Sequence, residues 1–238
     1  MFSDREDARR CQTVLLKLAG HLRGGLVLTG GPACRWHLQR HGREPEGGPL
    51  NDIDLVVADL AAVSPSLGEE FLISHFHPTR GHGKILLQLV DTSERVRVDL
   101  FTPFSPTLMS RVHRTELCGL SCGIIAAEDL TARLLAIVYD VTAGMPVDPK
   151  YYDKFCRLSE VVDLHVVRDI WPDYRKPDAP CSFDEATDAV RQSIGQTPDL
   201  LRPEVYGQPG DAACPWCCVS EVFSVSPPAK IFAVLGYV

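Results

Sequence analysis

Periodic and alternating apolar positions predict a chain that mixes helices with strands. Residues 6–22 place Val14, Leu15, Leu18 and Leu22 on one helical face. Short apolar or alternating segments bounded by turn formers then predict strands at 26–29, 52–57, 71–77, 84–90 and 95–101. A helix is predicted after the first of these strands. The first half of the chain therefore favours one sheet with helices around it.

The second half carries helical spacing. Residues 127–141 and 149–170 each repeat apolar positions every three to four residues. Ser182 with Glu185 forms a capping box for a last helix that runs through Ile194. The order of elements predicts the α/β (α+β) class, a mixed sheet with flanking helices and a helical C-terminal half. We expect a core at 1–125 and a helical region with an irregular, cysteine-containing tail at 126–238.

Composition narrows the class of protein. The 238 residues are 45% hydrophobic and 23% charged, as in a globular protein with its own core. A formal net charge of −7 argues against a generally basic coat for nucleic acid. No apolar run reaches the length of a membrane span, and the charged N-terminus does not read as a secretory signal. We therefore expect a cytoplasmic protein that does not bind a membrane.

A pair of glycines follows the strand at 26–29. Gly30 and Gly31 open the next helix, with Pro32 in its first turn, where the missing N–H is not needed. A turn without side chains at a helix start presents backbone N–H groups to a phosphate. Because Pro32 removes one donor and the Walker lysine is absent, the turn is not a P-loop. We predict that Gly30 and Gly31 contact the phosphates of a nucleotide.

Two aspartates interrupt the apolar strand at 52–57. Side chains alternate faces along a strand, so Asp52 and Asp54 lie on the same face, with Cα atoms about 7 Å apart. Two such carboxylates in a half-buried place repel each other and raise one pKa. A magnesium ion relieves that repulsion and takes oxygen ligands together with phosphates. A solvated strand edge is the other interpretation, and the flanking Leu55, Val56 and Val57 argue against it.

A third carboxylate joins the pair if the later strand lies alongside. In the alternating segment 95–101, Asp99 shares a face with Arg97 and Phe101. Pairing of this strand with the strand at 52–57 would gather the three acids. Such a cluster suits metal-assisted phosphoryl or nucleotidyl transfer, in which a third acid binds metal or accepts the proton of the attacking hydroxyl.

The order of these pieces resembles the nucleotidyltransferase superfamily of the polymerase-beta type. The pieces are "LTGG", "NDIDLVV" and "VRVDLF", in that order along the chain. The continuation "AEDLTARLLAIV" and "DPKYYDKFCRL" is similar to the helices of the abortive-infection toxin nucleotidyltransferases. The resemblance covers roughly residues 26–164 and implies that superfamily's mixed sheet.

Two departures from the family pattern concern phosphate binding. "HGREPEGGP" lengthens the segment between Gly31 and Asp52. Leu134 occupies a helix position where related toxins often carry a phosphate-binding lysine. We predict that Lys150 of the following helix replaces the missing phosphate-binding lysine, and that Arg43 also binds the nucleotide. Lysines and arginines of this kind are more often simply exposed to solvent.

The resemblance and the aspartates together imply a magnesium-dependent enzyme. One or two Mg²⁺ ions bound by Asp52, Asp54 and Asp99 would position an NTP, and Asp99 would help to deprotonate an acceptor hydroxyl. The sequence does not identify the molecule that accepts the nucleoside monophosphate. It would be RNA or a protein if the enzyme is toxin-like and has an antitoxin partner, or a small molecule such as an antibiotic. A relative that binds NTP without turnover is the alternative outside enzymes.

Cysteines and histidines offer a weaker metal signal. "CPWCC" contains the pair Cys214 and Cys217, followed by Cys218, and "HFH" places His75 and His77 on one strand face with His82 nearby. A closed zinc site needs about four ligands, and each motif alone supplies only half of such a set. The sequence therefore leaves zinc binding open.

Overall fold

The structure is a computed structural model that describes residues 4–43, 50, 52–80, 84–117, 119–203, 217 and 223–236. Its strands are β1 (Leu26–Leu28), β2 (Asp52–Val56), β3 (Phe71–Arg80), β4 (Lys84–Asp91), β5 (Arg97–Phe101), β6 (His113–Leu117) and β7 (Leu120–Ile124). They form one sheet in the order β3-β4-β5-β2-β1-β7-β6. β2 is parallel to β5 and β1 is parallel to β7, whereas the other neighbours are antiparallel. The predicted α/β class with a mixed sheet is confirmed.

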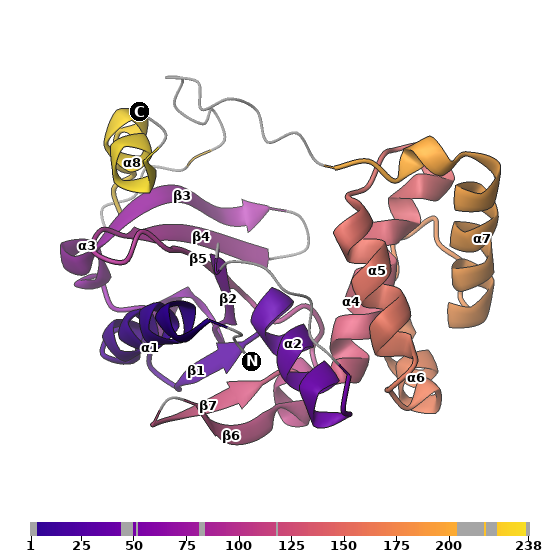
Figure 1. The fold of residues 1–238 in the computed structure, drawn as a ribbon, viewed down its shortest axis with the longest axis horizontal. Helices are drawn as coiled ribbons and strands as arrows, with labels where there is room; N and C mark the ends of the chain where they lie inside the picture. The colour runs from indigo at the N-terminus through magenta and orange to yellow at the C-terminus, as the bar shows by residue number, and fades with distance from the viewer. Residues whose placement is uncertain are drawn as a thin grey trace.

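Helices surround this sheet. They are α1 (Arg5–Ala19), α2 (Gly30–Arg40), α3 (Leu67–Glu70), α4 (Ala127–Val138), α5 (Pro149–Ser159), α6 (Leu164–Tyr174), α7 (Phe183–Gln196) and α8 (Pro228–Leu235), with 3-10 turns η1 (Leu60–Ala62), η2 (Leu108–Arg111), η3 (Tyr139–Ala143) and η4 (Pro198–Leu200). Figure 1 shows α4 to α7 grouped together at one side of the sheet, and α8 beside β3. Among the described residues, no helix combines the length and the apolar character that crossing a membrane requires.

The central strands are the most deeply buried part of the sheet. Alternate residues of β2 and β5, among them Ile53, Leu55 and Val98, are fully buried in one continuous core. Because side chains alternate along a strand, the opposite face of β2 and β5 carries the polar residues of these strands, together with Val56 and Phe101. The candidate site lies on that opposite face.

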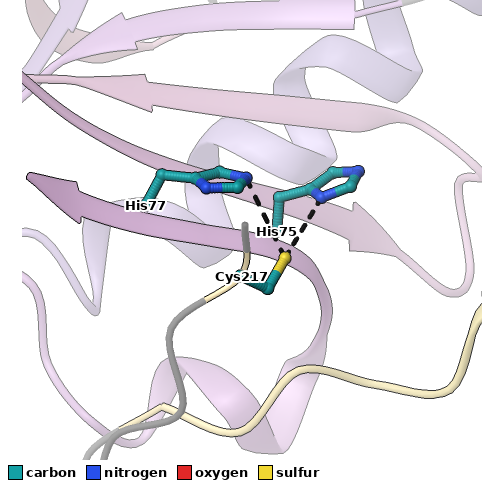
Figure 2. Close-up of side chains that lie close together, drawn as sticks. All are labelled: His75, His77 and Cys217. Atoms are coloured by element: carbon teal, nitrogen blue, oxygen red, sulfur yellow. Dashed lines mark hydrogen bonds between the residues drawn. The ribbon is translucent and has the colours of Figure 1, made fainter. Parts of the chain in front are cut away.

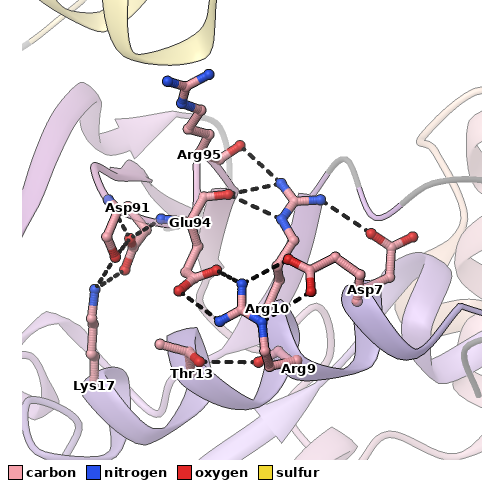
Figure 3. Close-up of polar contacts among 10 residues, drawn as sticks. Asp7, Arg9, Arg10, Thr13, Lys17, Asp91, Glu94 and Arg95 are labelled. Atoms are coloured by element: carbon pink, nitrogen blue, oxygen red, sulfur yellow. Dashed lines mark hydrogen bonds and ion pairs between the residues drawn. The ribbon is translucent and has the colours of Figure 1, made fainter.

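Ion pairs fix α1 to the turn that joins β4 to β5 (Figure 3). Arg9 donates to both carboxylate oxygens of Glu94, at 3.2 and 2.9 Å, and Arg10 donates to the backbone carbonyl of Glu94. Lys17 donates at 2.7 Å to Asp91, whose carboxylate is fully buried and also accepts from two backbone N–H groups of the turn. Asp91 lies on the strand next to β5, so these contacts support the strand that carries Asp99.

A buried carboxylate ties the helices on the other side together. Asp129 of α4 has no exposed surface, and it accepts two hydrogen bonds from the guanidinium of Arg111, at 2.8 and 2.6 Å. The hydroxyl of Tyr174 in α6 donates to the same carboxylate. Burying a charge is costly unless it is paired and hydrogen-bonded, and both conditions are met here.

The structure corrects two of the predicted helices. The single helix predicted at 149–170 is two helices, because α5 ends at Ser159 and Asp163 caps α6 by accepting from the backbone N–H of His165. The first helix ends at Ala19, and Leu22 instead forms a β-bridge with Val63. The last predicted helix is confirmed, with Ser182 accepting from the N–H of Glu185.

The sequence analysis predicts neither the hairpin β6–β7 nor the helices α3 and α8. The hairpin β6–β7 lies between the predicted strand at 95–101 and the predicted helix at 127–141, and α8 lies in the tail that the sequence predicts to be irregular. Apolar residues of α8 pack on Leu72 of β3 and Val90 of β4. The predicted division of the chain at residue 125 stays a prediction.

Candidate active site

The pairing of β2 with β5 brings two of the three predicted carboxylates side by side. Asp54 is the register partner of Asp99, and Asp52 is the partner of Arg97. Directly opposite residues of neighbouring strands project from the same face of the sheet. The structure therefore confirms that Asp52, Asp54 and Asp99 share one face, at the centre of the sheet.

The three carboxylates differ in exposure. The Asp52 side chain is 41% exposed, and its Oδ2 atom lies 3.7 Å from an Nη2 of Arg97. Asp54 and Asp99 are half-buried. The Oδ1 atom of Asp99 is buried and has no hydrogen-bond partner among the described residues. A buried acceptor without a donor is costly, so this oxygen marks a place where a cation or a proton donor would be stabilising.

Burial and mutual repulsion perturb the two inner acids. Burial, followed by the charges of Asp52 and Asp99, raises the pKa of Asp54 to about 8, and the charge of Lys154 offsets only part of this. Burial also raises the pKa of Asp99, against a hydrogen bond from Gln88 and the charge of Arg97. Both shifts show that the negative charges of Asp54 and Asp99 are unfavourable in this place. A bound cation would offset that cost, so the cluster favours binding a positive charge.

The glycine turn lies directly against Asp54. Gly30 has a φ of +59°, and a Cβ atom built on it would fall 1.8 Å from Oδ2 of Asp54. The backbone N–H of Gly31 donates to the Asp54 carboxylate, and the N–H of Thr29 donates at 2.9 Å to the Asp54 carbonyl. Gly30 thus provides both the left-handed backbone and the space that this approach requires. Contact of the two glycines with a phosphate stays a prediction.

A second cation beside the cluster is Lys154 of α5. A Cβ atom built on Gly31 would lie 3.9 Å from the Lys154 Nζ, and the Lys154 charge acts on Asp54. Sequence reasoning named Lys150 instead, one helical turn earlier on the same face. The Nζ of Lys150 lies 3.5 Å from Oδ2 of Asp148 and 5.0 Å from the ring centre of Tyr151. The four-residue spacing from Lys150 to Lys154 was the signal that could have found the second lysine.

Arg43 and Leu134 lie in other surroundings. Arg43 forms an ion pair with Glu160 at 3.0 Å, and both side chains are more than half exposed. Leu134 is buried in the core, and its neighbour Arg133 lies over the ring of Phe104 at 4.5 Å. A nucleotide-binding role for Arg43 stays a prediction.

Two polar residues that sequence reasoning missed support Asp99 from the side of β4 and β3. Gln88 is the register partner of Asp99 across β4–β5, and its amide donates to the Asp99 carboxylate. The Ser74 hydroxyl in turn donates at 2.9 Å to Oε1 of Gln88. Ser74 lies at a β-bulge, between the Ile73 and His75 pairs, and the extra residue turns its side chain towards Gln88. This chain of hydrogen bonds holds Asp99 facing Asp54.

A hollow of about 240 Å³ lies some distance along α2 from this cluster. It is lined by Trp36, His37 and His113, among other residues, and none of the three carboxylates belongs to its lining. The ring of Trp36 lies under the guanidinium of Arg40 at 4.7 Å. The convergence of acids, glycines and lysine, rather than this hollow, marks the candidate active site.

Comparisons with known proteins add one likeness. No family model and no curated protein matches the sequence. Among solved structures, the chain is similar to the crystal structure of an antigenic nucleotidyltransferase-like protein from Paracoccidioides brasiliensis. The sequence identity is 15%, the likeness covers 84% of this chain and 92% of that chain, and the TM-score is 0.43. The chemical interpretation of the site therefore depends on the residues of this chain.

Proposed function

We propose that the chain is a magnesium-dependent nucleotidyltransferase that moves a nucleoside monophosphate from an NTP to an acceptor hydroxyl. The observation that carries the proposal is the registered pair Asp54–Asp99, with Asp52 on the same face, beside a glycine turn and Lys154. Carboxylates hold divalent cations, and a helix start with a lysine suits phosphates, so the two halves of a metal–nucleotide substrate have adjacent partners.

The residues present fit a hard divalent cation. The donor set consists of carboxylate oxygens, which Mg²⁺ prefers, and Mg²⁺ usually binds through one or two carboxylates together with substrate phosphates. The Oδ1 of Asp99 has no hydrogen-bond partner in the described part of the chain, and the charge of Asp54 is disfavoured by burial. A positive charge between the two carboxylates would stabilise both. Asp52, Asp54 and Asp99 would hold one or two ions, which neutralise charge on the phosphates and polarise the reacting oxygens.

The reaction that this arrangement suits is a displacement at the α-phosphorus of the NTP. The acceptor oxygen forms a bond to that phosphorus, the bond to the bridging oxygen of pyrophosphate breaks, and the hydroxyl proton passes to a carboxylate. Asp99 is our candidate for that base, since burial raises its pKa towards that of a useful proton acceptor. Gln88 orients Asp99 through its hydrogen bond, and catalysis then consists mainly of positioning and charge neutralisation.

Lys154 takes the role that sequence reasoning gave to Lys150. Its ammonium group lies at the start of α2, where backbone N–H groups and the helix dipole already favour negative charge. A triphosphate placed there would have Lys154 on one side and the glycine turn on the other. Replacing Lys154 by Met should raise KM for NTP more than tenfold, whereas Lys150→Met should change it less than threefold. Comparable losses in both variants would contradict this assignment.

The acceptor is proposed as a class only. A hydroxyl of RNA or of a protein would suit a toxin-like enzyme with an antitoxin partner, and a small hydroxylated cation would suit the acidic chain, with its net charge of −7. Purified protein would be incubated with each labelled NTP and Mg²⁺ in the presence of total RNA, a protein lysate or a panel of antibiotics. The fraction that takes up label identifies the acceptor class.

The matched variants are Asp54→Asn and Asp153→Asn. We expect Asp54→Asn to abolish label transfer and pyrophosphate release while the protein stays folded, because a neutral amide is a much weaker ligand for Mg²⁺ than a carboxylate. Asp153 neighbours Lys154 in α5, and its side chain is 55% exposed, so Asp153→Asn should retain activity. Full transfer by Asp54→Asn would refute the enzyme proposal. Magnesium-dependent NTP binding without pyrophosphate release over the whole panel would instead indicate a binding protein.

A further inference from the structure

Two histidines of the edge strand β3 and one cysteine from the C-terminal part of the chain converge on one point (Figure 2). His75 and His77 are two residues apart, so their side chains lie on the same face of β3, and their rings stack at 5.5 Å between centroids. Cys217 lies against both rings although it is 142 residues away from His75. One ligand atom of each residue lies within 4.8 Å of the other two.

The two sulfur–nitrogen distances are close to those around a tetrahedral zinc ion. With Zn–S near 2.3 Å and Zn–N near 2.0–2.1 Å, a tetrahedral angle places sulfur about 3.6 Å from each nitrogen. The Sγ of Cys217 lies 3.3 Å from Nδ1 of His75 and 3.9 Å from Nε2 of His77. The two values lie on either side of the expected separation, so small side-chain rotations would equalise them.

We propose that His75, His77 and Cys217 bind a zinc ion. Imidazole nitrogen and thiolate sulfur are the ligands that zinc selects, whereas magnesium and calcium take oxygen. His77 is 4% exposed, and His75 and Cys217 are half-buried, so the site is sheltered yet open enough to be loaded. Three protein ligands leave one position of the tetrahedron for water. Cys214, Cys218 and His82 lie outside the described residues and form no part of the proposal.

The site is distinct from the carboxylate cluster. His75 is the register partner of Gln88, and Gln88 is the partner of Asp99, so His75 and Asp99 lie on one face two strands apart. Neighbouring strands are about 4.8 Å apart, which places these two Cα atoms about 10 Å from each other. The donor sets also differ, since one site offers only oxygen and the other nitrogen and sulfur. The two sites should therefore bind different metals side by side.

Zinc at this position would fasten the C-terminal segment to the open edge of the sheet. The N–H of Ser226 donates at 2.7 Å to the carbonyl of Ile73, and α8 packs on Leu72 and Val90. Covering an edge strand protects it from pairing with other chains. A metal bridge between residues so far apart in sequence stabilises the fold by restricting the unfolded chain, as other cross-links do. The proposed role is structural.

The test is metal binding by the full chain after removal of metals with a chelator. We expect about one zinc per chain, a higher Tm with zinc than without it, and thiolate-to-metal charge-transfer absorption when Co²⁺ replaces zinc. Losing an outer-shell partner costs a metal site about 10–100-fold in affinity, so Cys217→Ser and His75→Ala, which remove ligands, should each weaken zinc binding by more than about 100-fold.

Two controls separate this site from other thiols and from the carboxylates. Cys181→Ser removes an exposed thiol elsewhere and should leave zinc binding and the cobalt spectrum unchanged. Asp54→Asn should also leave them unchanged. Cys217 lies outside helices and strands, so Cys217→Ser should match the wild-type circular dichroism without metal. Zinc binding by Cys217→Ser equal to that of wild type, or a cobalt complex without thiolate absorption, would overturn the proposal and leave a thiol hydrogen-bonded to two histidines.

Discussion

The contact between Gly30 and Asp54 predicts a sharp difference between two neighbouring glycines. An alanine at position 30 would place its Cβ 1.8 Å from Oδ2, 2.6 Å from Cγ and 2.8 Å from Cβ of Asp54. No rotation of the Asp54 side chain alone removes a contact with its own Cβ, so the strand or the helix start must shift. At position 31 the nearest of these neighbours is Lys154 Nζ at 3.9 Å, which is an ordinary contact.

The loss of stability expected for Gly30→Ala has two contributions. The left-handed backbone at Gly30, with φ of +59°, costs an alanine roughly 1–2 kcal/mol. Overpacking against Asp54 costs about 1–3 kcal/mol more. Together these give a loss of roughly 2–5 kcal/mol, and for chains of this length 1 kcal/mol corresponds to about 2–4 °C in Tm. Gly31→Ala should be neutral or stabilising by up to about 1 kcal/mol, since alanine favours a helix.

Thermal and urea unfolding, followed by circular dichroism in the presence of a chelator, would measure these differences without bound metal. We expect Gly30→Ala to melt roughly 4–20 °C below wild type and Gly31→Ala to melt at or above it. Nucleotidyl transfer should be lost in Gly30→Ala even below its melting temperature, because Asp54 is displaced. Equal melting temperatures and equal activities for the two variants would refute the close approach of the turn to Asp54.

Three further predictions concern buried charges. Burial raises the pKa of Asp54 to about 8, so the stability linked to its protonated form is present below its ordinary pKa and is lost as pH rises through 8. Since one pKa unit is worth about 1.4 kcal/mol, urea unfolding in chelator should show Asp54→Asn to be more stable than wild type by roughly 4–6 kcal/mol at pH 8 and little different at pH 4. Burial lowers the pKa of His37 to about 4, so the stability linked to its neutral form is present above pH 6.5 and is lost as pH falls through 4. His37→Gln should therefore reduce the dependence of the free energy of unfolding on pH between these values in the same urea assay. Arg111→Met leaves Asp129 buried without its ion pair and should cost about 3–5 kcal/mol in urea unfolding, whereas Arg168→Met removes a half-exposed ion pair and should cost less than about 1 kcal/mol. Equal losses from the two arginine variants would contradict the importance of burial.

Local sequence pattern predicted the centre of the sheet well. Alternation places Asp52, Asp54 and Asp99 on one face of their strands, and the parallel pairing of β2 with β5 confirms that they converge. The pattern works here because these strands are buried on their other face, so a shift of one residue would expose a whole apolar row. The catalytic roles of the three acids stay a prediction.

Elements at the edges were predicted less well. β6 is mostly exposed and reads His113-Arg114-Thr115-Glu116-Leu117, so it has no apolar alternation to identify it. The break between α5 and α6 was hidden because Val161 and Val162 continue the apolar spacing through it, and both pack on the core. Asp163 was the only local signal for the new helix start.

Contacts between residues far apart in the sequence could not be predicted from local sequence patterns. Lys154 acts at the site because α5 lies against the start of α2. The four-residue spacing puts Lys150 and Lys154 on one helix face, but it does not show which of the two lies beside the acids. Likewise, His75 and His77 on one strand and Cys217 in the tail were recognised as two separate weak motifs. Only the tertiary structure shows that they meet.

The strand order also implies a sequence of folding events. β3, β4 and β5 are neighbours in both chain and sheet, whereas β1 at residues 26–28 must wait for β7 at 120–124, and β2 must wait for β5. Because closing long loops costs entropy before any contact rewards it, we expect the three-stranded meander to form first and β2 to dock onto it later. Pulsed hydrogen exchange during refolding would then protect the amides of β4 before those of β2. A newly made chain would thus bring its three acids together only after the meander had formed.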